Sequence, residues 1–303
     1  MQILSLKDLK EFHDETAVTD GGFDGIHVGH KTIIAETVRQ AKENGLKSVL
    51  VTFRRPPRLF FHPECYLLTT LDEKIELISG LGIDYILLLD FPEVRGLEAE
   101  DFVQDILIDG LNAKRLVIGF NHHFGHGGRG NSELLVRNID RWRLFLTVVP
   151  PIFVDGFPVS STLIRGFITA GRVEDAMLCL GHPYFVTGKV IEGMGVGRQI
   201  GFPTANIAVP EAKLLPADGV YAGYCEVNGE TYIAAIFIGH KRTLGHDKRS
   251  LEAHLIGFDG DLYGKKLRLK FIRRIRDERK FDSIDELRAR ISEDIAEIKR
   301  LLE

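Results

Sequence analysis

The sequence is poor in the residues that build disulfide frameworks, and it has no long apolar run. It contains three cysteines and one tryptophan in 303 residues. Cys65, Cys179 and Cys225 are odd in number and share no metal-ligand spacing, so we expect reduced thiols packed in the interior. No apolar run approaches the ~20 residues that span a bilayer, and Met1–Lys10 lacks the apolar stretch of a signal peptide. These absences predict a cytoplasmic protein that makes no membrane contact.

A large excess of charge of one sign is also missing. The formal net charge is -4, and lysines and arginines are spread along the whole chain. This distribution argues against a nucleic-acid-binding surface, and no feature indicates an obligate protein partner. The 44% hydrophobic and 27% charged residues are typical of a globular protein, and the length suits two domains.

Apolar runs alternate with amphipathic stretches between about Glu15 and Pro150. The runs predict strands buried on both faces, as in a parallel sheet, at residues 48–53, 85–90, 115–120 and 146–150. A helix is expected over Lys31–Asn44, and a capping box of Thr70 and Glu73 predicts the start of another. Strand and helix in alternation predict a doubly wound, Rossmann-like α/β domain over residues 1–182.

In the rest of the chain the pattern changes, and apolar and polar residues alternate along the predicted strands. Strands are predicted at residues 185–190, 220–227, 231–238, 251–256 and 267–272. Asn228–Gly229 is typical of a type I′ hairpin turn. A second capping box, Ser283 and Glu286, opens a final helix. Residues 183–303 are therefore predicted to form a small antiparallel β-barrel followed by a C-terminal helix.

A glycine-rich loop with two histidines precedes the first long helix. Gly21 and Gly29 permit tight turns and a close approach to a ligand around Phe23. A helix start offers unpaired N–H groups to phosphate. His27 and His30 can point the same way and stabilise charge on a phosphoryl group. The alternative is two histidines in an ordinary polar loop.

Two further segments supply polar groups that suit a nucleotide site. The hydroxyls of Ser160, Ser161 and Thr162 precede Arg165 at another apparent helix start, where they could hold a triphosphate. In isolation this segment is an ordinary helix cap. Asn121 follows the strand at 115–120 and is expected to border the same cleft, beyond the strand ends.

Three more histidines cluster in the sequence after that strand. His122, His123 and His126 could be interpreted as metal ligands. Their loop is rich in glycine and has no paired Cys, Asp or Glu ligand nearby. The sequence therefore favours a polar loop over a metal site.

A second candidate site lies in the barrel half. Gly197 and Arg198 suit a loop that folds over phosphates. The Thr204 hydroxyl and the Asn206 carboxamide are hard oxygen ligands of the kind that Mg²⁺ takes. Alternation places Glu252 on the polar face of a strand, either as a solvated side chain or as a base in phosphoryl transfer.

Eight motifs occur in a characteristic order: G-x-F-D-G-x-H-x-G-H, G-F-N-x-x-F-G, S-S-T-x-x-R, G-R-x-x-G-F-P-T-A-N, G-V-Y, E-x-H, D-L-Y-G and R-D-E-x-K-F. Over nearly its whole length the chain thereby resembles the prokaryotic bifunctional riboflavin kinase/FMN adenylyltransferases, also called FAD synthetases. The resemblance implies ATP-dependent phosphorylation of riboflavin to FMN with Mg²⁺. It also implies adenylylation of FMN to FAD by ATP, with release of pyrophosphate.

The resemblance also implies a role for each candidate residue. In the kinase, Thr204 and Asn206 contact Mg²⁺ and ATP, Glu252 is the catalytic base and Arg276 contacts the flavin. In the adenylyltransferase, His27 and His30 contact the ATP phosphates and Asn121 lines the site. A second phosphate clamp is formed by Ser160, Ser161 and Arg165.

Two segments depart from the family pattern. Residues 52–57 read T-F-R-R-P-P where the family usually has T-F-D-P-H-P, and residues 237–244 read F-I-G-H-K-R-T-L where it has N-I-G-x-x-P-T-F. Arg54 and Arg55 follow a predicted strand and are expected to attract phosphates there. The departures leave two rival hypotheses: a monofunctional riboflavin kinase whose first half only binds nucleotide, and a non-catalytic flavin-binding or flavin-sensing protein.

Overall fold

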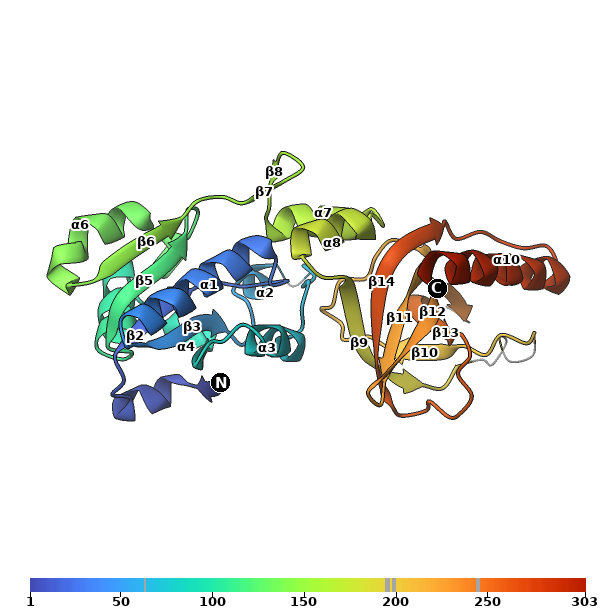
Figure 1. Cartoon of the computed structure of the whole chain (residues 1–303), viewed down its shortest axis with the longest axis horizontal. Helices are drawn as coiled ribbons and strands as arrows, with labels where there is room; N and C mark the ends of the chain where they lie inside the picture. Colours follow the sequence, from blue (N-terminus) through green and yellow to red (C-terminus); the bar gives the residue numbers. More distant parts are fainter. Residues whose placement is uncertain (63, 194–196, 198–199, 244–245) are drawn as a thin grey trace. The chain divides into compact units, whose positions relative to one another are not determined.

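The computed structural model describes residues 1–303 apart from 63, 194–196, 198, 199, 244 and 245, and no side chain is described from 241 to 248. The chain divides into two compact units, Met1–Ser160 and Ser161–Glu303 (Figure 1). Each unit has its own sheet and its own buried core.

The first unit is built on a six-stranded parallel sheet of order β1-β4-β3-β2-β5-β6. Its strands are β1 (Gln2–Leu4), β2 (Thr16–Asp20), β3 (Lys47–Phe53), β4 (Tyr85–Leu89), β5 (Ala113–Gly119) and β6 (Phe145–Val149). The four strands expected from apolar runs are confirmed as β3 to β6. β1 and the central strand β2 were not predicted from the sequence, because both are short and the threonines of β2 interrupt the apolar run although the sheet buries them.

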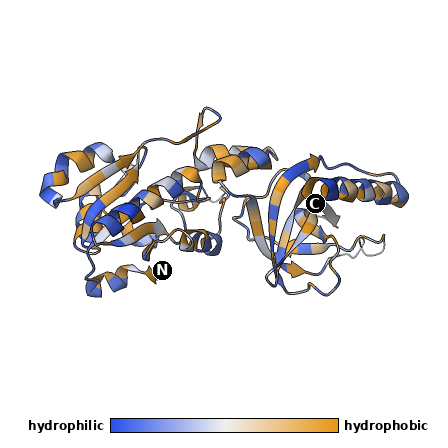
Figure 2. Cartoon of the chain, in the orientation of Figure 1, coloured by the Kyte–Doolittle hydropathy of each residue, from blue (hydrophilic) through white to orange (hydrophobic). Residues whose placement is uncertain are grey.

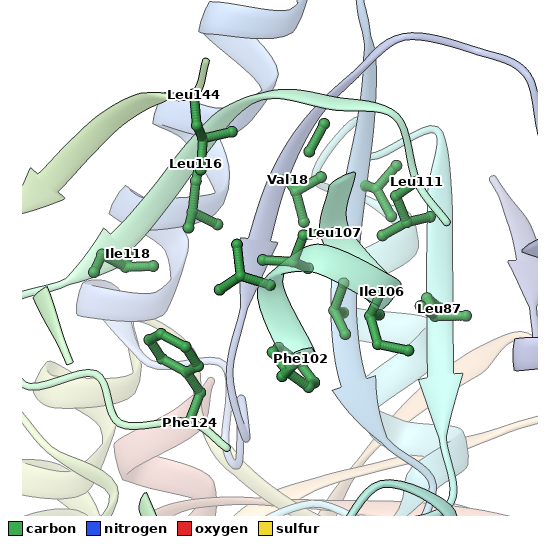
Figure 3. Packing of buried hydrophobic residues seen from close by; sticks show 14 of the residues in the cluster. Val18, Leu87, Phe102, Ile106, Leu107, Leu111, Leu116, Ile118, Phe124 and Leu144 are labelled. Carbon is green, nitrogen blue, oxygen red and sulfur yellow. The ribbon is translucent and has the colours of Figure 1, made fainter. Parts of the chain in front are cut away.

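Helices cover both faces of this sheet, which confirms the doubly wound architecture. They are η1 (Leu6–Glu11), α1 (Val28–Glu43), α2 (Arg58–Phe61), α3 (Leu71–Ser79), α4 (Phe91–Val94), α5 (Ala99–Asp101), the π-helix η2 (Phe102–Ile108), η3 (His126–Gly128) and α6 (Ser132–Trp142). On one face, α1 and α3 bury Ile34 and Ile78 against Leu50 of β3. On the other, Phe102 and Leu107 of η2 join the cluster around the strands (Figure 3).

The order of the strands creates a switch point beside β2. The chain passes from β2 to β3 and β4 on one side, and then crosses to β5 on the other side of β2. Open α/β sheets bind ligands at the carboxyl ends of the strands where this reversal occurs. The segments that leave β2 and β5 at this edge are the glycine-rich loop and the Asn121 loop.

The helix after the glycine-rich loop begins earlier than predicted. It starts at Val28 rather than Lys31, with His27 as its N-cap, and ends at Glu43, with Asn44 as its C-cap before Gly45. Histidine is not a usual N-cap residue, so the sequence pattern did not reveal this start. The Thr70–Glu73 capping box of α3 is confirmed.

The second unit combines two short helices, a closed six-stranded barrel and a terminal helix. Helices α7 (Ser161–Thr169) and α8 (Val173–Leu180) come first. The barrel order is β10-β13-β12-β11-β14-β9, with all neighbours antiparallel. Its strands are β9 (Tyr184–Ile191), β10 (Ala205–Ala208), β11 (Gly219–Val227), β12 (Glu230–Thr243), β13 (His246–Leu255) and β14 (Lys266–Arg276).

A small hairpin, β7 (Phe153–Val154) and β8 (Phe157–Pro158), closes the first unit.

The barrel confirms the alternating pattern. Asn228 and Gly229 both have positive φ, as a type I′ turn requires, and join β11 to β12. Bands of blue and orange alternate along β14 in Figure 2. The terminal helix α10 (Ile284–Leu302) buries Ile298 against β11, and Phe237 of β12 packs on the same cluster. Ser283 caps α10 as predicted, but Glu286 accepts from the backbone N–H of Asp282 instead of completing the capping box.

The boundary between the units differs from the predicted domain boundary. Compactness groups α7 and α8 with the barrel, so the units divide after Ser160. The functional boundary at 182/183 stays a prediction, because compactness does not say which activity the two helices serve.

Candidate active sites

The glycine-rich loop holds a strained but well-packed backbone. Phe23 and Ile26 both have positive φ, at 46° and 43°, although neither is glycine. Such conformations cost on the order of 1–3 kcal/mol each and persist where the surroundings fix them. Both side chains are buried in the core under α1 and α3. The core packing thereby fixes the loop in the shape that brings the two histidines to the end of β2.

Asp24 fixes the same loop through hydrogen bonds to the segment before α3. Its carboxylate accepts hydrogen bonds from the backbone N–H groups of Leu68 and Thr69, at 3.2 and 3.0 Å, and from the Thr69 hydroxyl at 3.2 Å. The Thr69 hydroxyl oxygen also accepts from the backbone N–H of Gly25. The carboxylate nearest to the histidines therefore braces the loop against the segment before α3.

His27 and His30 point the same way, as their spacing predicted. Their rings stack with centroids 3.5 Å apart and planes 16° apart. Nδ1 of His27 accepts a hydrogen bond from the backbone N–H of His30, so this histidine also caps α1. Gly29 lies between them, and a Cβ there would come within 3.2 Å of the His27 ring. Gly21 and Phe23 lie at the start of the same loop, where Phe23 meets His30 edge-on at 5.1 Å.

The His30 imidazole is held in its neutral form. Burial, followed by the charges of His27 and Lys74, lowers the pKa of His30 well below its ordinary value of 6.5. Its Nδ1 is buried and has no hydrogen-bond partner in the described part of the chain. A neutral imidazole still has one N–H, which can donate a hydrogen bond to a phosphate oxygen beside a helix start.

The loop after β5 carries Asn121 on an exposed surface at the switch point. His122 turns back into the sheet, where its Nε2 lies 3.1 Å from Oδ2 of Asp20, the last residue of β2. His123 lies 3.1 Å from the Gly128 carbonyl oxygen and His126 lies 3.2 Å from a Glu98 carboxylate oxygen. The three histidines thus have three different partners, and across the described residues no group of His, Cys, Asp and Glu is arranged to hold a metal ion.

The second phosphate-binding segment divides at the boundary of the units. Ser160 ends the first unit, while Ser161, Thr162 and Arg165 lie in the first turns of α7 in the second. The predicted helix start is confirmed. The approach of these side chains to His30 stays a prediction.

Arg54 and Arg55 lie beyond the carboxyl end of β3, as expected. Nε of Arg54 lies 3.6 Å from a carboxylate oxygen of Asp90, and both side chains are about half exposed, at 47% and 51%. The Arg55 guanidinium lies over the ring of Phe60 at 5.1 Å. Arg54 thus contacts the residue that follows β4, and Arg55 contacts α2, both through weak surface interactions.

The kinase candidates meet where β10 pairs with β13. The Thr204 hydroxyl donates a hydrogen bond to Oε2 of Glu252 at 3.0 Å. Asn206 is the register partner of Glu252 across the two strands. The predicted alternation is confirmed, because Leu251 and Ala253 are buried while Glu252 is only partly so. Hydroxyl, carboxamide and carboxylate oxygens are thereby gathered on one face.

Two glycines let the backbone approach these side chains. A Cβ on Gly193 would collide with the Asn206 carboxamide, and one on Gly197 would collide with the Phe202 carbonyl and come within 3.2 Å of the Thr204 hydroxyl. Glycine is therefore required at both positions for close packing. Arg198, predicted to bind phosphate, lies outside the described residues.

A cavity of about 530 Å³ is lined in part by Thr204. Its lining comes from β9, β10, β13 and the segment after β13, and includes Val190, Thr204, Leu255, Phe258, Asp261 and Tyr263. Small-molecule sites of this kind are concave, mostly apolar and supplied with a few polar groups. Thr204 belongs both to this cavity and to the hydrogen bond with Glu252.

Arg276, the predicted flavin contact, is engaged within the protein. Its Nε donates to both carboxylate oxygens of Asp294, at 3.0 and 2.9 Å, and its guanidinium lies 5.7 Å from the Phe281 ring. Asp294 is buried on α10, so the pair ties β14 to the terminal helix. The flavin contact stays a prediction, and the structure adds a structural role.

Two family models divide the chain between them. The FAD synthetase model matches residues 9–163, and the riboflavin kinase model matches residues 180–302. The bifunctional riboflavin kinase/FMN adenylyltransferase of Pseudomonas fluorescens is 34% identical over 99% of this chain and 98% of its own length. That of Bacillus subtilis is 35% identical over 96% and 94%. The chain belongs to this bifunctional family.

A solved structure agrees with the fold over the whole chain. Described as a macrolide-efflux protein from Streptococcus pneumoniae, it is 30% identical, covers 98% of both chains and has a TM-score of 0.89. No helix among the residues described for the present chain is long and apolar enough to cross a membrane.

Four residues at the candidate sites were not predicted from the sequence. Lys74 of α3 is buried under the glycine-rich loop, and Asp20 pairs with His122. Phe258 and Tyr263 line the cavity beside Thr204. The motif D-L-Y-G was a usable signal for Tyr263, whereas a lysine inside an amphipathic helix gives no local sign of burial.

Proposed function

We propose that this chain makes both flavin cofactors. It phosphorylates riboflavin with ATP to give FMN, and it adenylylates FMN with a second ATP to give FAD and pyrophosphate. The observation that carries the proposal is that each family model falls on a region with its own candidate site. The stacked His27 and His30 lie within residues 9–163, and the Thr204–Glu252 pair lies within 180–302.

The kinase step needs a base because the 5′-hydroxyl of riboflavin is a neutral alcohol and a poor nucleophile. We assign this role to Glu252, which accepts the hydroxyl proton while the alcohol oxygen attacks the γ-phosphorus of ATP. The bond from that phosphorus to the bridging oxygen of ADP breaks. The Thr204 hydroxyl donates to Glu252 and so orients the carboxylate.

The donor set beside Glu252 fits Mg²⁺. Thr204 and Asn206 offer a hydroxyl and a carboxamide oxygen, which are hard neutral ligands of the type that leaves room for water and phosphate oxygens. We propose that these two residues hold the ion. When bound, Mg²⁺ neutralises charge on the transferred phosphoryl group.

The adenylyl-transfer step has a different requirement. The phosphate of FMN is mostly a dianion at pH 7, with a second pKa of about 6, so its oxygen attacks the α-phosphorus of ATP without help from a base. The bond to the pyrophosphate oxygen breaks. We assign the stabilisation of the developing charge to His27 and His30 at the start of α1, aided by Asn121, Ser160, Ser161 and Arg165.

One incubation tests the proposal. The purified chain is mixed with riboflavin, ATP and Mg²⁺, and the flavins are separated by chromatography. Formation of FMN and then FAD supports it. FMN alone would indicate a monofunctional riboflavin kinase, and neither product would indicate a non-catalytic flavin-binding protein.

We also propose that the enzyme works in the cytoplasm, where ATP is available. Among the described residues, Cys65, Cys179 and Cys225 form no disulfide, which is usual in that compartment. That the chain needs no protein partner stays a prediction.

A further inference from the structure

We infer that Lys74 is a positioning residue of the adenylyl-transfer site: its buried ammonium ties the glycine-rich loop that leads to His27 and His30 to the carboxyl end of β3. The inference rests on the proposed function of the first unit. It concerns a residue outside every motif that the sequence analysis singled out.

The Lys74 side chain is only 3% exposed and ends beneath the loop. Its Nζ lies 3.4 Å from the Gly22 carbonyl oxygen, 3.1 Å from the Thr52 hydroxyl oxygen and 3.0 Å from the Phe53 carbonyl oxygen. An ammonium has three N–H donors, and three oxygens surround it here. Lys74 thereby joins the loop that leaves β2 to the carboxyl end of β3.

This arrangement distinguishes positioning from direct catalysis. All three donors of Lys74 are directed at protein oxygens, so none is left for a substrate phosphate. The loop that it holds contains Phe23 and Ile26 with positive φ, a conformation that depends on its surroundings. Without the contact to Gly22, the loop and the two histidines lose their fixed position at the switch point.

The charge of Lys74 has a second consequence. The titratable groups that face one another here are Asp24 in the loop, His27 and His30 at the start of α1, and Lys74 on α3. Burial lowers the pKa of Lys74 to about 8, although Asp24 opposes the shift. The ammonium is therefore mostly charged at neutral pH, and it adds to the burial that lowers the pKa of His30.

The central test compares Lys74→Met with Lys74→Arg. We expect Lys74→Met to lower kcat for FAD formation from FMN by about 10²-fold, because small misplacements of a catalytic group have effects of this size. Riboflavin phosphorylation by the same molecules checks the protein concentration and the second unit, and thermal unfolding of each variant checks the fold of the first unit. Lys114→Met is the matched control, because Lys114 lies near the opposite end of the sheet in β5 and is paired with Glu15 on the surface.

The second readout does not require activity. The His30 imidazole is followed by NMR across pH and assigned with a His30→Gln variant. We expect the midpoint to rise in Lys74→Met, although burial still holds it below the ordinary value, and to stay at the wild-type position in Lys74→Arg, which keeps the charge. In the wild type, FAD formation should also decline as pH rises through about 8, where Lys74 loses its proton, and this decline should disappear in Lys74→Arg.

Several results would overturn the inference. A Lys74→Met variant with wild-type FAD formation excludes the positioning role, and equal His30 midpoints in all three proteins exclude the charge effect. If Lys74→Met does not fold, the Lys74→Arg variant is measured alone. An ordinary His30 midpoint in that variant, which keeps the charge, would also exclude the charge effect. If the wild type forms no FAD, the proposed function fails first, and the His30 titration still shows whether Lys74 controls that imidazole.

Discussion

The two candidate sites solve different chemical problems with different parts of the chain. The first lies where a loop leaves the central strand of a parallel sheet, and it centres on the stacked imidazoles of His27 and His30. The second lies across two paired antiparallel strands and centres on a carboxylate. The difference follows from the nucleophile, because an alcohol needs a base and a phosphate dianion does not.

The sites also differ in how the backbone is held. In the first, buried side chains impose positive φ on Phe23 and Ile26, and the Asp24 carboxylate and the Lys74 ammonium tie the loop to neighbouring elements. In the second, Gly193 and Gly197 let the chain pass close to Asn206 and Thr204. Loss of the Asp24 or Lys74 charge should therefore disturb the backbone of the first site, whereas added bulk at Gly193 or Gly197 should disturb that of the second.

The largest effect is expected from Glu252→Gln. This change preserves shape and removes the base, so riboflavin phosphorylation should fall by roughly 10²–10⁴-fold. FAD formation from supplied FMN should persist, because the two sites lie in different units and distant changes act independently. Near-normal kinase turnover in the variant, measured with saturating ATP, would make Glu252 an ordinary strand residue.

His30→Ala is expected to affect the other activity. Loss of one charge-stabilising donor should lower FAD formation from FMN on the order of 10²–10³-fold, while FMN formation from riboflavin stays unchanged. Product chromatography of both reactions on one preparation checks the separation. Loss of both activities with the fold intact would contradict the assignment of two sites.

Gly193→Ala should give an intermediate effect on the kinase alone. The new methyl group must displace the Asn206 carboxamide, and a displacement near 1 Å can lower a rate by up to about 10²-fold. Gly166→Ala is the control, since a Cβ there meets nothing within 4 Å. Steady-state kinase assays of both variants measure the effect. Equal rates would show that displacement of the Asn206 carboxamide does not slow the reaction.

The smallest effect is expected from Arg54→Ala and Arg55→Ala. Two guanidiniums at the end of β3 should attract the phosphates of ATP or FMN, so their loss should raise KM for adenylyl transfer severalfold at low salt. The difference should shrink as salt increases, because exposed charges are screened over ~8–10 Å near physiological ionic strength. Unchanged KM at low salt would leave both arginines with only their contacts to Asp90 and Phe60.

Much of this fold could be predicted from the sequence because its apolar residues follow clear strand and helix patterns. Apolar runs indicated β3 to β6, and alternation with Asn228–Gly229 indicated the barrel. The central strand β2 was missed because its burial depends on its neighbours in the sheet and not on its own composition. The role of His27 as a helix cap and the burial of Lys74 were missed for the same reason, since both depend on tertiary contacts.

The most direct test of two separate sites in one chain is a mixing experiment. Glu252→Gln and His30→Ala are each incubated with riboflavin, ATP and Mg²⁺, alone and together, and FAD is measured by chromatography. Alone, Glu252→Gln should form little of either product, and His30→Ala should accumulate FMN. Mixed, they should form FAD, because FMN released by one protein is adenylylated by the other. A mixture that accumulates FMN without FAD, although Glu252→Gln is folded, would contradict the account.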